Sequence, residues 1–353
     1  MKRTDKLLAA LPENTAALLH NASNIFYLSG YTGEGLLLVA PGINAVITDF
    51  RYVEAAEKQC PGFTVHAIRA GVSHVQVANE LLKNAGFGKL AVEDNVVTVR
   101  AMKEIEKTMP GMEFIPMDFR PEKLREVKDD DELSRIERAC DITCQAFEYI
   151  CGFIAPGCTE REIGLALDYK MLQLGAQGLA FDTIVASGEN GSLPHAVPGD
   201  REICEGDMIT IDFGARYEGY DADMTRTVAV GQPSEKMRRI YDIVLHAQET
   251  AQAAIAPGVR CSDIDKTARD IITEAGYGDC FGHSTGHGVG IDIHEEPRVS
   301  ARSEQILTPG NIVTVEPGIY VPGLGGVRIE NTCVVTETGV RALCGASKEL
   351  RIL

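Results

Sequence analysis

The sequence of 353 residues lacks the features that mark several classes of protein. No apolar run reaches the roughly 20 residues needed to span a bilayer, and the ten cysteines include no CxxC pair. Basic side chains are scarce, with 34 Lys and Arg against 51 Asp and Glu, which disfavours binding to nucleic acid or to anionic membranes. The N-terminal segment starts with basic residues, but Pro12 and Glu13 interrupt its apolar part, as is untypical of a signal peptide. We therefore expect a cytoplasmic protein whose thiols are reduced and mostly buried.

The composition that is present, 44% apolar and 24% charged, is typical of a globular protein with room for two domains. A polar segment at 117–131 predicts the boundary, which gives domains 1–121 and 122–353. The first domain alternates apolar strands with amphipathic helices and is predicted to be α/β. Its expected strands are 24–31, 35–42, 44–50 and 89–94, and its expected helices are 51–59 and 73–86.

The second domain contains an internal repeat. The tetrapeptide IAPG occurs at 154–157 and again at 255–258, each time followed by an amphipathic pattern that ends at a glycine. Further along, EGDMITIDFGARY at 205–217 parallels PGNIVTVEPGIY at 309–320, and a second expected strand follows each, at 221–230 and 326–335. Two copies are too few for a solenoid. They indicate instead a pseudo-twofold domain with two halves that face one cleft.

The repeat places acidic side chains at matching positions of these expected strands. Asp212 matches Glu316, and Asp223 matches Glu330. A carboxylate in a half-buried β-branched strand is costly unless it is paired or bound to a metal. Arg226 and Arg328 lie close in sequence and could pair with the acids, but metal ions serve four converging carboxylates better. Oxygen ligands with one imidazole suit Mn, Co or Fe, with Zn possible, and two ions about 3.5 Å apart are a common device for activating water.

Three of the eight histidines lie in FGHSTGHGVGIDIHEEPR, residues 281–298. His283 and His287 have the i, i+4 spacing of a zinc-protease helix, but that helix needs Glu beside the first His and helix formers between them. Gly286, Gly288 and Gly290 make a helix costly here. We predict a loop or strand in which backbone approaches another group closely.

These residues resemble the motifs of the pita-bread metallopeptidases, the creatinase and aminopeptidase family, and above all its proline-specific branch, prolidase and aminopeptidase P. The resemblance covers nearly the whole chain and implies a mixed α/β (α+β) fold. An N-terminal creatinase-like α/β domain would precede a C-terminal pseudo-twofold pita-bread catalytic domain. The motifs that carry the resemblance are PHAVPG (194–199), IDFGARYEGYDADMTRT (211–227), HSTGHGVG (283–290), IHEEP (293–297), VEPGIY (315–320) and RIEN (328–331).

The resemblance implies a set of five metal ligands for two divalent ions per chain, with Mn as the first expectation and Co or Zn as alternatives. Asp212 would chelate one ion, His287 and Glu316 would bind the other, and Asp223 and Glu330 would bridge the two. This set contains the four acids of the internal repeat and adds one imidazole. Creatinase keeps the fold but lacks these ligands, so the resemblance argues against a metal-free creatine hydrolase.

The resemblance also implies catalytic and substrate-binding residues. Glu316 would transfer the water proton, and His195 and His294, which occupy nearly equivalent places in the two halves, would donate hydrogen bonds to the oxyanion or substrate. His283 would help to form the proline pocket, and Arg328 would hold a ligand carboxylate. Arg298 matches an arginine with which some prolidases bind the proline carboxylate. For Tyr320 the sequence leaves two alternatives, a cap on the active site or a position in the core.

The function implied is metal-dependent hydrolysis of Xaa-Pro peptide bonds. We expect an Xaa-Pro dipeptidase acting on proline-containing dipeptides, with an Xaa-Pro aminopeptidase acting on longer peptides as the alternative. A non-enzymatic binding protein on the same fold is a distant third possibility, because such proteins usually lose ligands. The leading domain argues against methionine aminopeptidase. A homodimer is expected from the resemblance.

Overall fold

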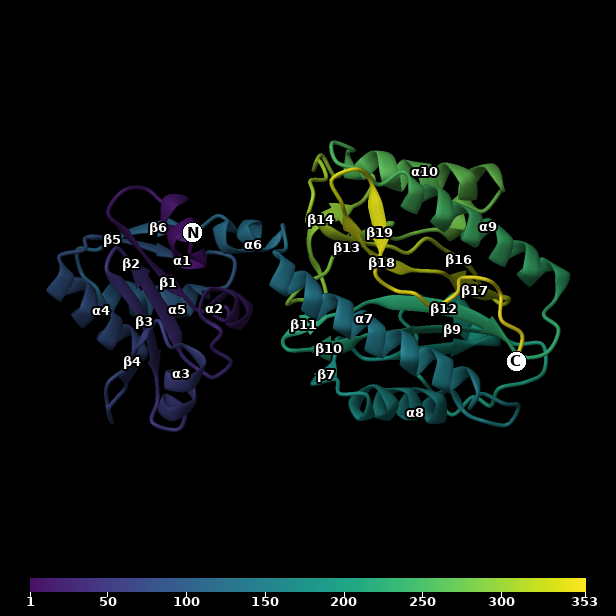
Figure 1. Cartoon of the computed structure of the whole chain (residues 1–353), viewed down its shortest axis with the longest axis horizontal. Helices are drawn as coiled ribbons and strands as arrows, with labels where there is room; N and C mark the ends of the chain where they lie inside the picture. The colour runs from purple at the N-terminus through teal and green to yellow at the C-terminus, as the bar shows by residue number, and fades with distance from the viewer. The chain divides into compact units, whose positions relative to one another are not determined.

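The computed structural model describes all residues 1–353, which form two compact units, Met1–Arg125 and Glu126–Leu353 (Figure 1). The chain passes from one unit to the other between Arg125 and Glu126, inside the polar segment expected at the boundary. None of its helices combines the length and the apolar character needed to cross a bilayer.

The first unit is built on a six-stranded mixed sheet in the order β4-β3-β2-β1-β5-β6. Neighbouring strands β1, β2 and β3 are antiparallel, whereas β4, β5 and β6 each pair in parallel with a neighbour. Aliphatic side chains such as Leu18, Leu38, Ile47 and Leu82 are buried in its core. The strands are β1 (Thr15–Leu19), β2 (Leu36–Ala40), β3 (Ile43–Thr48), β4 (Thr64–Ala67), β5 (Lys89–Val92) and β6 (Glu113–Pro116), and the helices are α1 (Arg3–Ala9), α2 (Ala22–Ser29), α3 (Val53–Gln59), α4 (His74–Ala85), α5 (Val99–Thr108) and α6 (Arg120–Arg125).

The strand predicted at 24–31 is wrong, because most of this segment forms helix α2. The side chain of Asn21 accepts hydrogen bonds from the backbone N–H groups of Ser23 and Asn24 and so caps the helix. Gly30 ends it in the left-handed conformation, with φ of 82°. These two end signals outweigh the strand propensity of the aromatic and β-branched residues between them.

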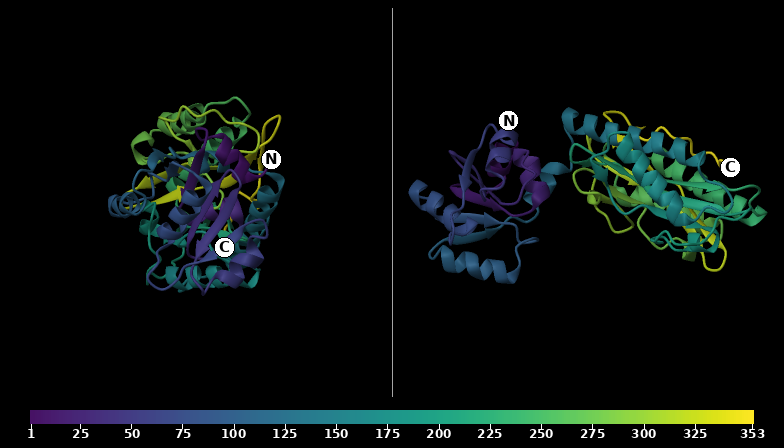
Figure 2. Two further views of the ribbon diagram at one scale, coloured as in Figure 1. Left: turned by 90° about the vertical axis from the view of Figure 1, so that its left-hand side faces the viewer. Right: turned by 90° about the horizontal axis from the view of Figure 1, so that it is seen from below.

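The second unit stacks helices on both sides of curved antiparallel sheets (Figures 1 and 2). Helices α7 and α8 pack together on one side, and α9 and α10 pack together on the other. The helices are α7 (Asp130–Cys151), α8 (Glu160–Gln173), α9 (Glu235–Ala253) and α10 (Cys261–Glu274). The strands are β7 (Gly178–Leu179), β8 (Ile184–Ser187), β9 (Met208–Phe213), β10 (Ala215–Tyr217), β11 (Tyr220–Asp221), β12 (Met224–Ala229), β13 (Gly286–Gly288), β14 (Glu295–Val299), β15 (Ile312–Val315), β16 (Gly318–Val321), β17 (Gly325–Arg328), β18 (Asn331–Val335) and β19 (Val340–Ala342).

The internal repeat of the sequence corresponds to two similar antiparallel pairs. In the first half β9 pairs with β12, and in the second half β15 pairs with β18. The single strand predicted at 326–335 is wrong, because the structure divides it into β17 and β18, which belong to different sheets. Glu330 lies in the break between them. The pseudo-twofold, mixed α/β fold expected for this half is confirmed.

Candidate metal centre and active-site cleft

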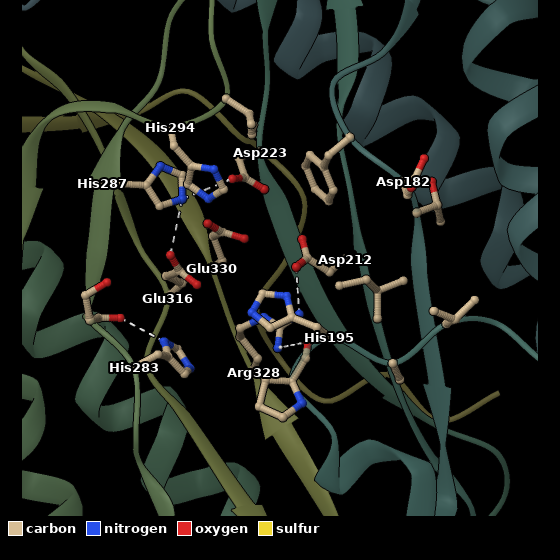
Figure 3. Close-up of a pocket in the computed structure, with 18 of the residues that line it drawn as sticks. Asp182, His195, Asp212, Asp223, His283, His287, His294, Glu316, Arg328 and Glu330 are labelled. Atoms are coloured by element: carbon tan, nitrogen blue, oxygen red, sulfur yellow. Dashed lines mark hydrogen bonds and ion pairs between the residues drawn. The ribbon is translucent and has the colours of Figure 1, made fainter. Parts of the chain in front are cut away.

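The ten candidate site residues line a cleft of about 560 Å³ in the second unit, a volume typical of small-ligand sites. Figure 3 shows the acidic side chains at its centre and histidines around them. The lining residues include His195, Asp212, Asp223, His283, His287, His294, Arg298, Glu316, Arg328 and Glu330. The structure therefore brings together all ten residues that the sequence nominated.

The four acids lie at or beside strand ends. Asp212 is in β9, and Asp223 immediately precedes β12. Glu316 immediately follows β15, and Glu330 lies in the break before β18. The sequence predicted a place within a strand for each acid, which holds only for Asp212.

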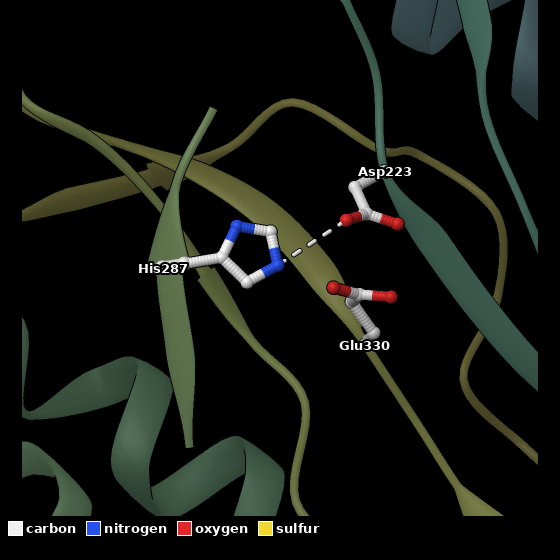
Figure 4. Close-up of side chains that lie close together, drawn as sticks. All are labelled: Asp223, His287 and Glu330. Carbon is white, nitrogen blue, oxygen red and sulfur yellow. Dashed lines mark ion pairs between the residues drawn. The ribbon is translucent and has the colours of Figure 1, made fainter. Parts of the chain in front are cut away.

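His287 faces the acids through one defined ring nitrogen (Figure 4). Its Nδ1 lies 3.0 Å from the carbonyl oxygen of Gly288, which can only accept, so Nδ1 carries the proton. Its Nε2 lies 3.5 Å from Oδ2 of Asp223 and 3.3 Å from Oε1 of Glu316. One ligand atom from each of Asp223, His287 and Glu330 falls within a 4.8 Å cluster. Burial alone would lower the pKa of His287, but its contacts with Glu316 and Gly288 outweigh burial and raise it. As a metal ligand the ring would be neutral and would present the lone pair of Nε2 to the point where the carboxylates meet.

The acids repel one another in a site removed from water. Burial and the charges of neighbouring carboxylates raise the pKa of Asp223 and of Glu330 well above the ordinary range. Burial acts in the same direction on Glu316, but its contact with His287, together with the charges of His283 and Arg328, outweighs burial and lowers the pKa of Glu316. Two buried carboxylate oxygens, Oδ1 of Asp212 and Oε1 of Glu330, have no hydrogen-bond partner. Such a cluster needs concentrated positive charge.

The residues fit a divalent metal ion. Carboxylate oxygens and one imidazole nitrogen form a donor set that Mn, Co and Zn accept. The two buried carboxylate oxygens without a hydrogen-bond partner are suited to be metal ligands, because no group of the chain satisfies them.

Arg328 begins a hydrogen-bond chain that runs behind the acids. Its Nη2 donates to Oδ2 of Asp212 at 2.6 Å, and its Nη1 donates to the hydroxyl of Tyr320 at 2.9 Å. That hydroxyl lies 2.8 Å from Nε2 of His283, whose Nδ1 is bound to the carbonyl of Ser284. Since a carbonyl only accepts, Nδ1 of His283 is the protonated nitrogen, and the Tyr320 hydroxyl donates to Nε2. Burial raises the pKa of Tyr320 to about 12 and lowers that of His283, which keeps these protons in place.

The loop that carries His195 is held from two sides. Nη1 of Arg328 donates to the carbonyl of Pro194 at 3.3 Å. The fully buried carboxylate of Glu160 accepts from the backbone N–H groups of Ser187 and Gly199, at 2.8 and 3.2 Å. Sequence reasoning missed Glu160, because the N–H groups that it binds lie 27 and 39 residues further along the chain, which no local pattern indicates.

The remaining two candidates are His294 and Arg298, which also line the cleft. The ring of His294 packs edge-on against that of His287, with centroids 4.3 Å apart. Arg298 lies on β14 with 55% of its side chain exposed, and its Nε is 3.9 Å from Oε1 of Glu296. The guanidinium is therefore free to turn towards a ligand.

Arg226, the other cation considered for the acids, has a different role. Its guanidinium donates to the backbone carbonyls of Glu330, Ala346 and Ser347 and to the side chain of Asn331. It makes no ion pair with the acidic cluster and instead attaches the C-terminal segment to β12.

A buried acid and imidazole cluster in a cleft, between two halves of a duplicated domain, defines a metal-dependent enzyme centre. Comparison with known proteins gives the class. A profile of metallopeptidase family M24 matches residues 134–337, and a profile of the creatinase/prolidase N-terminal domain matches residues 3–127. The chain belongs to metallopeptidase family M24, and it is a peptidase with the creatinase-type leading domain.

Three similar proteins span almost the full chain. The uncharacterized peptidase YqhT of Bacillus subtilis (strain 168) is 44% identical over 95% of both chains. The structure of Xaa-Pro dipeptidase from Bacillus anthracis is 42% identical over 99% of both chains, with a TM-score of 0.96. That of X-Pro aminopeptidase from Thermotoga maritima MSB8 is 36% identical over 100% of both, with a TM-score of 0.93. The expected family and peptidase class are confirmed.

Proposed function

We propose that this protein is a dinuclear metal-dependent Xaa-Pro dipeptidase that hydrolyses the bond before proline in dipeptides. The observation that carries the proposal is a buried acid and imidazole cluster in the same cleft as an arginine that is half exposed and only loosely paired, at 3.9 Å from Glu296. Two divalent ions would be held by Asp212, Asp223, His287, Glu316 and Glu330, with Mn as the first candidate and Co or Zn as alternatives. The likeness to an Xaa-Pro dipeptidase along the full chain supports this reading.

The tertiary amide of proline lacks an N–H and is held rigid by its ring. The bound ions would supply the Lewis acidity that polarises the carbonyl and makes water acidic at neutral pH. The carboxylate of Glu316 accepts a proton from the attacking water and delivers it to the proline nitrogen as the bond breaks. His195 and His294 flank the acids in Figure 3 and donate hydrogen bonds to the developing oxyanion.

Two further residues shape the site. His283, whose proton position is determined by Ser284 and Tyr320, forms part of the wall against which the proline ring packs. Arg328 orients Asp212 through their ion pair of 2.6 Å and neutralises one carboxylate of the cluster. In this scheme Tyr320 acts behind the wall rather than as a cap over the cleft.

Arg298 decides between a dipeptidase and an aminopeptidase in this proposal. A dipeptide ends in a carboxylate directly at proline, whereas a longer peptide carries a neutral amide there. Because Arg298 lines the cleft and its nearest acid is at 3.9 Å, it can bind that carboxylate with two hydrogen bonds. The alternative, an Xaa-Pro aminopeptidase, needs no cation at this position, and the likeness to an X-Pro aminopeptidase favours keeping it as the second candidate.

The test compares three substrates that differ only after proline: Leu-Pro, Leu-Pro-amide and Leu-Pro-Gly. We expect kcat/KM to be highest for Leu-Pro. Arg298→Met should lower that value about 10- to 100-fold, the cost of one charged hydrogen-bonded contact, and leave Leu-Pro-amide nearly unchanged. Arg298→Lys is the matched control that keeps the charge. A preference of the wild type for Leu-Pro-Gly moves the assignment to aminopeptidase.

The metal and assembly are tested separately. Metal analysis of the wild type beside Asp223→Ala, with activity measured in Mn, Co and Zn, determines the number and kind of ions. A homodimer, a cytoplasmic location and a domain boundary after residue 121 also belong to the proposal. The first comes from the family resemblance, the second from the cysteine pattern and the third from the polar segment at 117–131. Light scattering tests the homodimer, cell fractionation tests the cytoplasmic location, and limited proteolysis tests the domain boundary.

A further inference from the structure

His294 is positioned by its loop rather than by hydrogen bonds of its own. The imidazole makes no hydrogen bond within the chain, and its ring contact is the edge-on packing against His287 at 4.3 Å. His294 ends the turn that leads from β13 into β14. Its place beside the acids, visible in Figure 3, therefore depends on whatever fixes that turn.

The carboxylate of Glu295 holds the turn from inside. Its Oε1 accepts hydrogen bonds from the backbone N–H groups of Ile291 and Asp292, at 2.9 and 3.1 Å. The carboxylate fills the space beside Gly290, where a Cβ atom would lie 2.5 Å from Oε2 of Glu295. On the outer side, the carbonyl of Gly290 accepts from the backbone N–H of Asp221 at 2.8 Å. Because Glu295 directly follows His294, its carboxylate links the end of the turn to its start.

Lys128 in turn holds Glu295. Its Nζ donates to Oε2 of Glu295 at 3.0 Å, and the two side chains are only 1% and 6% exposed. The backbone of Lys128 is itself fixed, because its N–H donates to the carbonyl of Gly310 at 2.9 Å, beside a bridge between Val127 and Asn311. A buried ion pair is weak evidence for stability, since apolar residues of similar volume often serve as well. A role in positioning the turn explains why a charged pair, rather than two apolar side chains, occupies this buried place.

We propose that Lys128 and Glu295 are positioning residues for catalysis, which hold the turn 290–294 so that His294 faces the substrate beside His287. This inference rests on the proposed function, since it assigns His294 a part in the same hydrolysis. Neither Lys128 nor Glu295 is among the residues that line the cleft. Their effect on the reaction is therefore assigned to the turn, which contributes Ile293 and His294 to the cleft lining.

A double-mutant cycle separates positioning from a general contribution to folding. The first change is the neutral pair Lys128→Met with Glu295→Gln, which avoids leaving one buried charge uncompensated. The second is His294→Ala. All four proteins, including the combined variant, are assayed on Leu-Pro with saturating Mn, and their metal content and thermal midpoints are measured. Glu295→Asp, which keeps the charge but shortens the reach, replaces the neutral pair if that variant does not fold.

We expect the neutral pair to lower kcat about 10- to 100-fold when His294 is present, with metal content unchanged. When His294 is already Ala, the same change should lower kcat by no more than about twofold. The inference is overturned if the neutral pair lowers kcat equally in both backgrounds, or if it does not lower kcat when His294 is present. Either result leaves the proposed function intact. A wild type that cleaves no Xaa-Pro peptide overturns both.

Discussion

Replacing Arg328 with lysine tests whether the guanidinium, and not merely its charge, organises the centre. Arg328 is almost fully buried and donates four hydrogen bonds from its side chain. The acceptors are Asp212 at 2.6 Å, Tyr320 at 2.9 Å, Thr225 at 3.1 Å and Pro194 at 3.3 Å. A lysine ammonium can stay with Asp212, but its single nitrogen cannot reach the other three.

The cost follows from the three bonds that are lost. A typical hydrogen bond contributes about 1 kcal/mol net and one from a charged guanidinium no less, so Arg328→Lys should destabilise the second unit by at least about 3 kcal/mol. For a domain of this size, that corresponds to a fall in Tm of about 6–12 °C. Activity should also fall, because the loop of His195 loses its link to the guanidinium through Pro194.

The assay is calorimetric unfolding in the presence of a chelator, so that metal binding does not contribute to the comparison. Tyr320→Phe is the matched control. It removes the acceptor of one Arg328 bond and also the donor to Nε2 of His283, so it should cost about two thirds of the effect. A Tm within about 2 °C of the wild type for Arg328→Lys would refute the reasoning, because it would mean that charge alone maintains the site.

Three other predictions follow from charge and burial. Mn at 100 times its Kd should stabilise the protein by about 2.7 kcal/mol, which is measured as a rise in Tm. Asp223→Ala should abolish this rise, and an equal rise in the variant would contradict the proposed ligands. Burial raises the pKa of Glu93, so the folded form binds a proton more readily and stability should fall as pH rises from about 4.5 through that raised pKa. The free energy of opening, measured by hydrogen exchange of the β1 amides, should fall with pH in the wild type and not in Glu93→Gln. Cys204 is exposed and should react quickly with an aromatic disulfide reagent. Cys333 is buried, which raises its pKa to about 12, so it should react only when the protein unfolds. Equal reaction rates of the two thiols would contradict this difference in burial.

The acids could be found from the sequence because duplication marked them twice. Asp212 and Glu316 occupy matching places in two similar segments, and no chance surface charge explains that pairing. The contacts behind them could not be found in this way. Lys128 and Glu295 are 167 residues apart, and their pairing depends on the course of the backbone near Gly310.

Local signals were also misleading where two of them competed. The aromatic and β-branched residues of 24–31 favour a strand, yet caps at Asn21 and Gly30 produce a helix. The break between β17 and β18 had no sequence signal either, because Ile329 is a good strand former. That break is decided by tertiary contacts, since the N–H of Glu330 donates to the carbonyl of Thr225 in the other half.

The positions of the acids at strand ends explain how two halves can share one centre. Within a continuous strand, successive side chains alternate between faces, so residues of one strand cannot all turn to a common point. Asp223 and Glu330 lie outside the regular strands and escape this constraint. They are also the places where the halves are joined. The hydroxyl of Thr225 donates to Oε2 of Glu330 at 2.8 Å, and that of Thr332 donates to the carbonyl of Asp223 at 2.7 Å. Each half therefore orients an acid of the other, so the metal centre forms only when both halves are correctly paired.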